Sequence, residues 1–259
     1  MRSAAVTSTL FALLSSAGAL AAEATRSGTF DSAGVSIAYL VAGTGEPVVL
    51  IHGLYSSAGV NWEMPGTVKT LASRYQVVAL DVRGHGRSDK PQEENAYGLE
   101  MVEDVARLMD HLRIGKAHIV GYSMGGMIAL KFLSKHPDRA FSGTLGGMGW
   151  LREGSALQGF WEMLPGKGGI GTPAACVHSI ARLAVAEEAL RGIRVPVAVI
   201  VGDRDPVKRL YVEPLSRLRA DWPVIEIKDA GHLNCIFKEQ FKEELKRWLD
   251  KNARPEPGK

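Results

Sequence analysis

The stretch Gly121-Tyr122-Ser123-Met124-Gly125 holds a serine in a setting that could make it reactive. It lies between a short apolar run, which predicts a buried strand, and an amphipathic stretch, which predicts a helix. A chain that turns abruptly from strand to helix strains the middle residue, and flanking glycines remove the side chains that would collide there. The Ser123 hydroxyl would then lie at the carboxyl edge of a sheet, beside the positive end of a helix. This context predicts a serine nucleophile.

A serine hydroxyl is a poor nucleophile at neutral pH, so it needs a base within hydrogen-bond reach and a third group that orients the base. His232 follows one later apolar run, and two acids, Asp203 and Asp205, follow another. Both positions are loops after predicted strands, and the order along the chain is Ser, Asp, His. Each residue alone has an ordinary structural explanation. Together they predict a catalytic triad of Ser123, His232 and one of the two acids.

The elements that must position these residues alternate along the chain, which predicts an α/β fold with a mostly parallel central sheet and helices on both faces. An opening hairpin is predicted from strands at 29–31 and 35–41. The further predicted strands are 48–51, 77–80, 118–120, 141–145, 197–201 and 224–227. The predicted helices are 99–112, 124–135, 174–190, 208–219 and 238–249.

Residues 146–193 break this alternation and are too long for a simple loop, which predicts a short lid inserted into a core of residues 22–145 and 194–251. Two interpretations of its apolar side chains stay open, because they could line a pocket for an acyl group or attach the lid to the core. These side chains are Trp150, Phe160, Trp161, Met163 and Leu164. Residues 252–259 contain two prolines and predict a flexible tail.

The first residues are typical of a signal peptide rather than of the fold. Met1-Arg2 is positively charged, an uncharged stretch follows, and Ala19-Leu20-Ala21 resembles a signal-peptidase site. The stretch is too short and too rich in Ser and Thr for a membrane-spanning helix. The alternative to a signal peptide is a disordered or amphipathic N-terminal tail. Residues 1–21 are therefore predicted to be removed, leaving an exported protein, periplasmic or secreted, with no stable membrane insertion.

Composition narrows the class of protein further. A chain of 259 residues usually forms one large domain, and 46% hydrophobic with 23% charged residues excludes wholesale disorder. With 31 basic and 28 acidic residues, the net charge of +3 does not indicate nucleic-acid binding. Composition leaves the oligomeric state open. The 29 glycines, about 11%, exceed the usual ~7% and gather around the predicted site and in the lid.

Two cysteines, Cys176 and Cys235, lie far apart in the sequence. They form neither a disulfide framework nor a metal-binding spacing, so separate thiols are predicted, with a single bridge as the alternative. The sequence also has no phosphate-binding glycine loop and no His/Cys cluster. No cofactor and no metal are therefore predicted.

The sequence resembles the α/β-hydrolase family over nearly all of the predicted mature chain. Beside the Gly-x-Ser-x-Gly stretch, the resemblance rests on His52-Gly53-Leu54 after an early strand and on Asp-x-Arg-Gly-x-Gly-x-Ser at residues 81–88. It implies Ser123 as the nucleophile and His232 as the general base and then acid. The family's Gly-x-x-Asp pattern favours Asp205 over Asp203 as the residue that orients His232.

The resemblance also implies an oxyanion hole made by the backbone N–H groups of Leu54 and Met124, whose side chains would be free to shape the pocket. The segment at 81–88 is expected to hold a tight loop without taking part in the chemistry. His52 and His85 are likewise expected to be packing or loop residues rather than bases.

A serine at position 123, where family members that open epoxides or displace halide have an aspartate, points to the esterase-like branch and to acyl transfer. The expected reaction is hydrolysis of a small to medium carboxylic ester through an acyl-enzyme. Three alternatives share the fold: a C–C bond hydrolase acting on a vinylogous diketone, a cofactor-free perhydrolase or haloperoxidase-like enzyme, and a ligand-binding protein without turnover.

Overall fold

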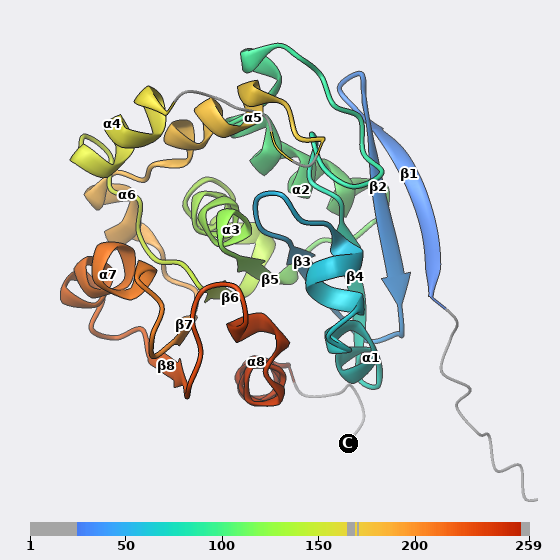
Figure 1. The fold of residues 1–259 in the computed structure, drawn as a ribbon. Coiled ribbons are helices and arrows are strands. Elements are labelled where there is room, and N and C mark those ends of the chain that lie inside the picture. The colour runs from blue at the N-terminus through green and yellow to red at the C-terminus, as the bar shows by residue number, and fades with distance from the viewer. Residues whose placement is uncertain (1–24, 165–168, 170, 255–259) are drawn as a thin grey trace, which may run out of the picture.

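The computed structural model describes residues 25–164, 169 and 171–254 (Figure 1). The predicted signal peptide at 1–21 and residues 255–259 of the predicted tail lie outside the described residues. Within them, one sheet has the strand order β1-β2-β4-β3-β5-β6-β7-β8. The strands are β1 (Arg26–Ser32), β2 (Val35–Ala42), β3 (Glu46–Ile51), β4 (Tyr75–Leu80), β5 (Ala117–Tyr122), β6 (Ala140–Gly146), β7 (Val197–Gly202) and β8 (Val224–Ile227).

The sheet is parallel from β4 to β8, and β2 is antiparallel to both of its neighbours. This confirms the predicted mostly parallel sheet. Each predicted strand overlaps an observed one, because strands buried on both faces are continuous apolar runs that a sequence displays directly. All six residues of β5 and of β7 are buried.

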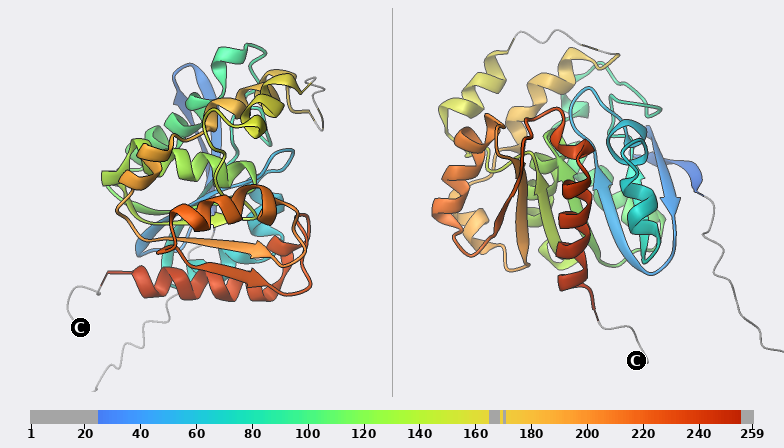
Figure 2. Two further views of the ribbon diagram at one scale, coloured as in Figure 1. Left: turned by 90° about the vertical axis from the view of Figure 1, so that its left-hand side faces the viewer. Right: turned by 60° about the horizontal axis from the view of Figure 1, so that its bottom comes forward.

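Helices cover both faces of the sheet, as predicted (Figure 2). Successive residues of a strand point to opposite faces, so Val49 packs in the hydrophobic cluster with α2 (Leu99–His111) and α3 (Met124–Lys135). Its neighbour Val48 packs in a second cluster with α1 (Thr67–Ala72) and α8 (Glu239–Asn252). The predicted helices at 99–112 and 124–135 are confirmed, whereas α1 was not predicted.

The predicted opening hairpin is confirmed. Strand β1 pairs antiparallel with β2, and Ser32 lies opposite Val35, which leaves a two-residue turn. Both turn residues have positive φ, 55° at Ala33 and 83° at Gly34, as the right-handed twist of a hairpin favours. Alanine rarely adopts this conformation, because its Cβ approaches the following carbonyl.

The predicted helix at 174–190 is wrong as a single element. The chain forms α5 (Ala174–His178), a 3₁₀ turn η4 (Ser179–Leu183) and α6 (Glu187–Gly192), with an extended break between η4 and α6. At the break, the Val185 N–H donates to the Leu151 carbonyl at 2.9 Å and the Trp150 Nε1–H donates to the Val185 carbonyl at 2.7 Å. These contacts replace the helical hydrogen bonds and join the break to the chain that follows β6. Another helix, α4 (Ala156–Met163), was not predicted.

Two smaller corrections concern the C-terminal third. The predicted helix at 208–219 consists of a π-helical turn, η5 (Lys208–Val212), followed by α7 (Glu213–Leu218). The predicted tail starts too early, because Asn252 belongs to α8 and its Nδ2 donates to the Trp248 carbonyl at 2.8 Å. The prediction of separate thiols is confirmed, since Cys176 and Cys235 are both free and buried.

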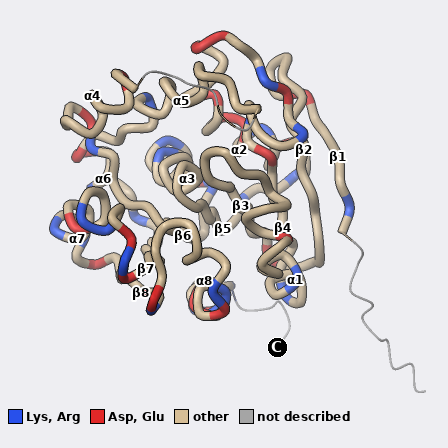
Figure 3. Tube along the Cα trace, viewed as in Figure 1, with Lys and Arg blue, Asp and Glu red and all other residues tan. Residues whose placement is uncertain are grey.

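Charged residues lie mainly on the outer helices and loops (Figure 3). The middle of that view, where α3 and the ends of β3 to β6 lie, is mostly free of them. Among the described residues, no helix is both long enough and apolar enough to cross a membrane.

Candidate active site

Ser123 lies between the end of β5 and the start of α3 in strained backbone, with φ 54° and ψ −120°. The two glycines of the motif are required by close backbone approach. A Cβ on Gly121 would lie 1.9 Å from the carbonyl oxygen of Gly125, and a Cβ on Gly125 would lie 2.1 Å from that of Ile51. No side chain fits in such a space, so both positions must be glycine for the chain to turn from β5 into α3 while packed against β3.

Three side chains from three loops form one hydrogen-bonded line at the carboxyl edge of the sheet. The Ser123 Oγ lies 2.9 Å from Nε2 of His232, and Nδ1 of His232 lies 2.8 Å from Oδ2 of Asp205. The Asp205 side chain is fully buried, and its other oxygen accepts the Val207 N–H at 2.9 Å. His232 keeps 26% of its side chain exposed, so the line runs from a buried carboxylate to an accessible hydroxyl.

Asp203, the competing acid, does not contact His232. Its carboxylate accepts the backbone N–H groups of Ala230 and Asp229 at 3.0 and 3.1 Å, and these bonds hold the pKa of Asp203 below its ordinary value. Arg204, the next residue, pairs with the Asp229 carboxylate. Asp203 therefore joins the loop after β7 to the loop after β8, and Asp205 is the acid that the structure brings to the imidazole.

The two backbone N–H groups expected to bind an oxyanion flank Ser123. Met124 is the first residue of α3, where a helical N–H has no partner within the helix. Leu54 follows Gly53, on which a Cβ would lie 3.1 Å from the Ser123 Cβ. Across the described part of the chain, neither N–H donates a hydrogen bond.

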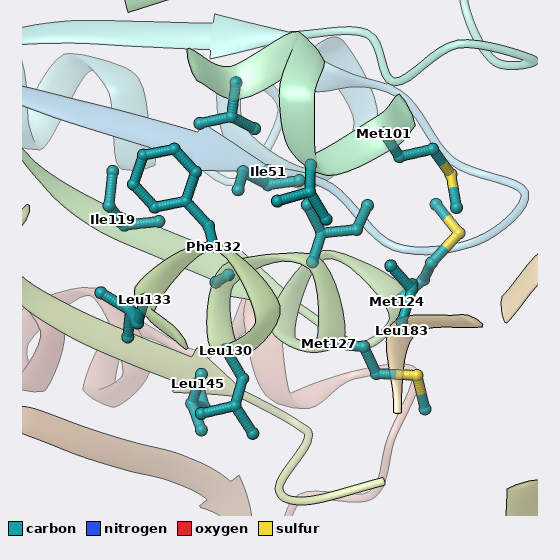
Figure 4. Packing of buried hydrophobic residues seen from close by; sticks show 14 of the residues in the cluster. Ile51, Met101, Ile119, Met124, Met127, Leu130, Phe132, Leu133, Leu145 and Leu183 are labelled. Carbon is teal, nitrogen blue, oxygen red and sulfur yellow. The ribbon is translucent and has the colours of Figure 1, made fainter. Parts of the chain in front are cut away.

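The Met124 side chain, expected to be free to shape the pocket, is buried. It is only 2% exposed and packs in the hydrophobic cluster beneath the turn (Figure 4). Leu54, in contrast, is partly exposed.

His52 holds the peptide group that carries the Leu54 N–H. Its Nδ1–H donates to the Gly53 carbonyl at 2.7 Å, and that carbonyl belongs to the same peptide as the Leu54 amide. Its Nε2 accepts the Val82 N–H at 2.9 Å, which fixes the tautomer. Burial lowers the pKa of His52, so the ring stays neutral. His52 is thus a loop residue, as expected, and it contacts the peptide next to Ser123.

Asn61 holds the preceding peptide, His52–Gly53, and was missed by sequence reasoning. It lies in a π-helical turn, η1 (Gly59–Glu63), and its Oδ1 accepts the Gly53 N–H at 2.9 Å. Short π-helical turns often occur at functional sites. No motif marks this asparagine, because its contact depends on how η1 folds back onto the loop after β3.

The segment at 81–88 holds the neighbouring loops. One carboxylate oxygen of Asp81 accepts the Ala58 N–H at 2.8 Å and the other accepts the Arg87 N–H at 2.9 Å. Arg83 donates two hydrogen bonds to the buried Asp104 at 2.7 and 2.6 Å. The segment therefore connects the loops after β3 and β4 to α2.

His85 lies beside His52, with their ring centroids 5.2 Å apart. Its Nδ1 is 3.2 Å from the Arg83 carbonyl, so an Nδ1–H donates to that oxygen. Burial and the neighbouring His52 lower the pKa of His85 to about 3, which leaves the ring uncharged at neutral pH. No hydrogen bond joins it to Ser123 within the described chain.

One tryptophan of the predicted lid binds within the lid and the other binds the core. Trp150 is buried and bound to Val185, and Trp161 Nε1–H donates to the Tyr211 hydroxyl at 3.1 Å. Phe160 and Met163 on α4 instead face solvent, with exposed fractions of 55% and 83%. Leu164, at the end of α4, is partly exposed.

No metal site is evident in the described part of the chain, since it has no group of three or more His, Cys, Asp or Glu side chains that could hold an ion.

Comparison with known proteins identifies the family. The family model described as alpha/beta hydrolase fold matches residues 46–178, just over half of the chain. The chain belongs to the α/β-hydrolase fold family. The matched range includes Ser123. Asp205 and His232, the other two residues of the hydrogen-bonded line, lie C-terminal to that range.

Curated relatives match only in part. The chain is 40% identical over 119 residues to the dihydrolipoyllysine-residue acetyltransferase component of the acetoin cleaving system of Pseudomonas putida, which covers 45% of this chain and 31% of that protein. It is 38% identical over 112 residues to the 2-hydroxy-6-oxo-6-phenylhexa-2,4-dienoate hydrolase of Burkholderia cepacia, covering 42% of this chain and 39% of that protein. The chain thus spans less than half the length of these relatives.

A solved structure matches over a longer stretch. The enol-lactonase from Burkholderia xenovorans LB400 superposes with a TM-score of 0.70 over 86% of this chain and 100% of that one. The sequence identity is 24%, so this likeness establishes the shared fold.

Proposed function

We propose that this α/β-hydrolase hydrolyses a carboxylic ester of small to medium size, with Ser123 as nucleophile, His232 as base and Asp205 as the residue that orients the base. One observation carries the proposal. The line from Ser123 Oγ through both ring nitrogens of His232 to Asp205 has donor–acceptor distances of 2.9 and 2.8 Å, within the range for an activated nucleophile.

In the acylation step, the Ser123 Oγ attacks the ester carbonyl as Nε2 of His232 takes its proton. Asp205 accepts the Nδ1–H bond throughout and stabilises the imidazolium that forms. The tetrahedral intermediate carries a negative oxygen, and the N–H groups of Leu54 and Met124 are its donors, each worth about 2.7–4 kcal/mol in comparable sites. The C–O bond then breaks, and the Nε2 proton passes to the departing alkoxide, which leaves as the alcohol.

Water completes the cycle by the same route in reverse. His232 takes a proton from the water as its oxygen attacks the acyl-enzyme carbonyl, and the same two N–H groups bind the second tetrahedral intermediate. The bond to the Ser123 Oγ breaks, and the Nε2 proton returns to that oxygen. The products are the carboxylic acid and the free enzyme, so the reaction needs water and no cofactor.

The test is hydrolysis of p-nitrophenyl acetate, butyrate and octanoate by Ser123→Ala. Turnover of every ester should fall by at least about 10³-fold, because no other group in the line can attack the carbonyl. Ser134→Ala is the matched control, since Ser134 is on the same helix, α3, and only donates to the Lys131 carbonyl. Turnover by Ser123→Ala equal to that of the control would refute the proposal.

A C–C bond hydrolase is the second candidate, favoured by the 38% identical hydrolase of 2-hydroxy-6-oxo-6-phenylhexa-2,4-dienoate. That substrate carries a ketone and no ester, so its hydrolysis breaks a carbon–carbon bond. Ser123→Ala does not separate the two activities, because both use a nucleophile and base at these positions. The two activities are separated by the ratio of kcat/KM for this dienoate to kcat/KM for p-nitrophenyl butyrate. A ratio above one would favour the second candidate.

A further inference from the structure

Tyr122, the residue directly before Ser123, makes a contact that the proposed mechanism does not use. It is the last residue of β5 and is 4% exposed. Its hydroxyl donates to the backbone carbonyl of His232 at 2.6 Å. Its ring lies 5.8 Å from the His232 ring and meets Phe241 of α8 edge-on, also at 5.8 Å between centroids. The side chain thus spans from the strand of the nucleophile to the loop of the base.

The loop that carries His232 has few other attachments at that point. Asp203 binds it at Asp229 and Ala230, before the histidine. The Gly231 N–H is bound by Asn234 of the same turn. Within the described chain, the bond from Tyr122 is the one that joins the backbone of residues 231–234 to another strand.

The solvent side of the turn gives no further support. Leu233, next to the histidine, is 85% exposed. On the inner side, Cys235 and Ile236, which follow the turn, are buried. The Tyr122 hydroxyl therefore holds the backbone of this turn at His232.

The Tyr122 ring itself cannot move freely. A Cβ on Gly146 or on Gly147 would lie within 2.8 and 2.9 Å of its ring atoms, so β6 and the chain after it press against the ring. Burial raises the pKa of Tyr122, so the hydroxyl keeps its proton and remains a donor. A rigid ring of fixed length thus links the residue before Ser123 to the His232 backbone.

We propose that Tyr122 is a positioning residue that sets the distance between Ser123 and His232 by holding the His232 backbone carbonyl. This rests on the proposed function, in which His232 takes the Ser123 proton. Asp205 fixes the rotation of the imidazole, and Tyr122 fixes where the histidine backbone lies relative to the nucleophile. A displacement of about 1 Å between reacting groups can cost on the order of 10²-fold in rate.

The test compares Tyr122→Phe with Tyr97→Phe. Each substitution removes one buried hydroxyl that donates to a backbone carbonyl, that of His232 or that of Pro91 at 2.7 Å, and each leaves the ring in place. Both variants are assayed below their melting temperatures by labelling with a fluorophosphonate and by p-nitrophenyl butyrate kinetics.

The expected result is specific to Tyr122. In Tyr122→Phe, the rate constant for labelling and kcat should both fall roughly 10- to 100-fold while KM stays within about twofold, since the ester still binds but the base is misplaced. Tyr97→Phe should label at a rate within about twofold of wild type. A general loss of stability would lower the melting temperature of both variants without this split between kcat and KM.

Two outcomes would overturn the inference in distinguishable ways. Equal labelling of wild type and Tyr122→Phe would show that Tyr122 does not position His232, and the proposed function would stand. No labelling of wild type at Ser123 would overturn the proposed function, and this inference with it.

Discussion

Replacing Asp205 by Asn keeps the size of the side chain and removes its charge from the Nδ1 side of His232. In the structure, Oδ2 of Asp205 accepts the Nδ1–H at 2.8 Å, which leaves Nε2 free to accept the Ser123 proton. An asparagine can turn its NH₂ group toward Nδ1, and Nδ1 must then be the acceptor. The ring proton moves to Nε2, so His232 would donate to Ser123 instead of accepting from it.

The size of the effect follows from this wrong tautomer. The same substitution in a serine protease triad lowers kcat about 10⁴-fold with the geometry intact. That factor corresponds to about 5.5 kcal/mol of activation free energy at 1.36 kcal/mol per decade. We expect a loss of this order for Asp205→Asn, with little change in KM.

Asp203→Asn is the matched control, because Asp203 lies two residues away and has no bond to His232. Its carboxylate accepts two backbone N–H groups of the loop after β8, and the oxygen of an asparagine can still accept from that loop. The loop should loosen, but the tautomer of His232 should not change. Activity is therefore expected to stay within about tenfold of wild type.

The assay is kcat/KM for p-nitrophenyl butyrate at pH 8, with the melting temperature of each variant measured alongside. The reasoning predicts a gap of about 10³-fold or more between the two variants. It is refuted if Asp203→Asn loses as much activity as Asp205→Asn, or if Asp205→Asn keeps more than a tenth of the wild-type rate. Either result would mean that the acid which orients His232 in solution is not the one the geometry indicates.

Two further predictions concern stability. Ala33→Asn should raise the free energy of unfolding by about 0.5–1 kcal/mol in urea denaturation, because asparagine tolerates the φ of 55° better than alanine; a Val variant there should lower it. Burial alone would raise the pKa of Glu46, but hydrogen bonds from Arg254 and His118 outweigh it and lower that pKa below 4.5. The charged carboxylate then stabilises the fold above about pH 4.5, and this contribution is lost as the pH falls through the lowered pKa. Glu46→Gln should therefore flatten the pH dependence of the unfolding free energy below about pH 5, and an unchanged slope would contradict this.

The sheet and the meeting of the three side chains were predictable for the same reason. Parallel strands buried on both faces are short apolar runs, and their carboxyl ends share one edge of the sheet. Residues placed directly after β5, β7 and β8 therefore lie near one another however far apart they are in the chain. Ser123, Asp205 and His232 occupy such positions, and the structure brings them to within 2.9 and 2.8 Å.

The parts that were missed depend on contacts between distant segments. Local periodicity favours one helix through Val185, but its backbone instead bonds to Leu151, more than thirty residues earlier. Tyr122 is an unmarked position inside the Gly-x-Ser-x-Gly motif, and its bond to His232 spans 110 residues. A pattern read along the chain has no access to such pairs, because tertiary contacts override local preference.

Several residues around the line of Ser123, His232 and Asp205 hold the backbone of the surrounding loops. His52, Asn61, Asp81 and Asp203 each use a polar side chain to bind backbone amides or carbonyls of the loops at this edge. Such bonds determine where the loops lie and leave their side chains free to differ. Position in the fold therefore explains how Ser123, His232 and Asp205 are brought together, and it does not indicate which ester the proposed hydrolase would cleave.

If the proposed function holds, selection of the substrate should depend on side chains that are not used in these bonds. We expect the predicted lid to supply them, because Phe160 and Met163 on α4 are exposed while Trp161, on the same helix, is bound to Tyr211 of the core. The bond from Trp161 to Tyr211 attaches α4 to the core, so the exposed apolar residues of α4 can change without disturbing the line of Ser123, His232 and Asp205. Differences in acyl-chain preference among variants of this chain should accordingly come from α4 and appear in KM, whereas changes at the loop-binding residues should appear in kcat.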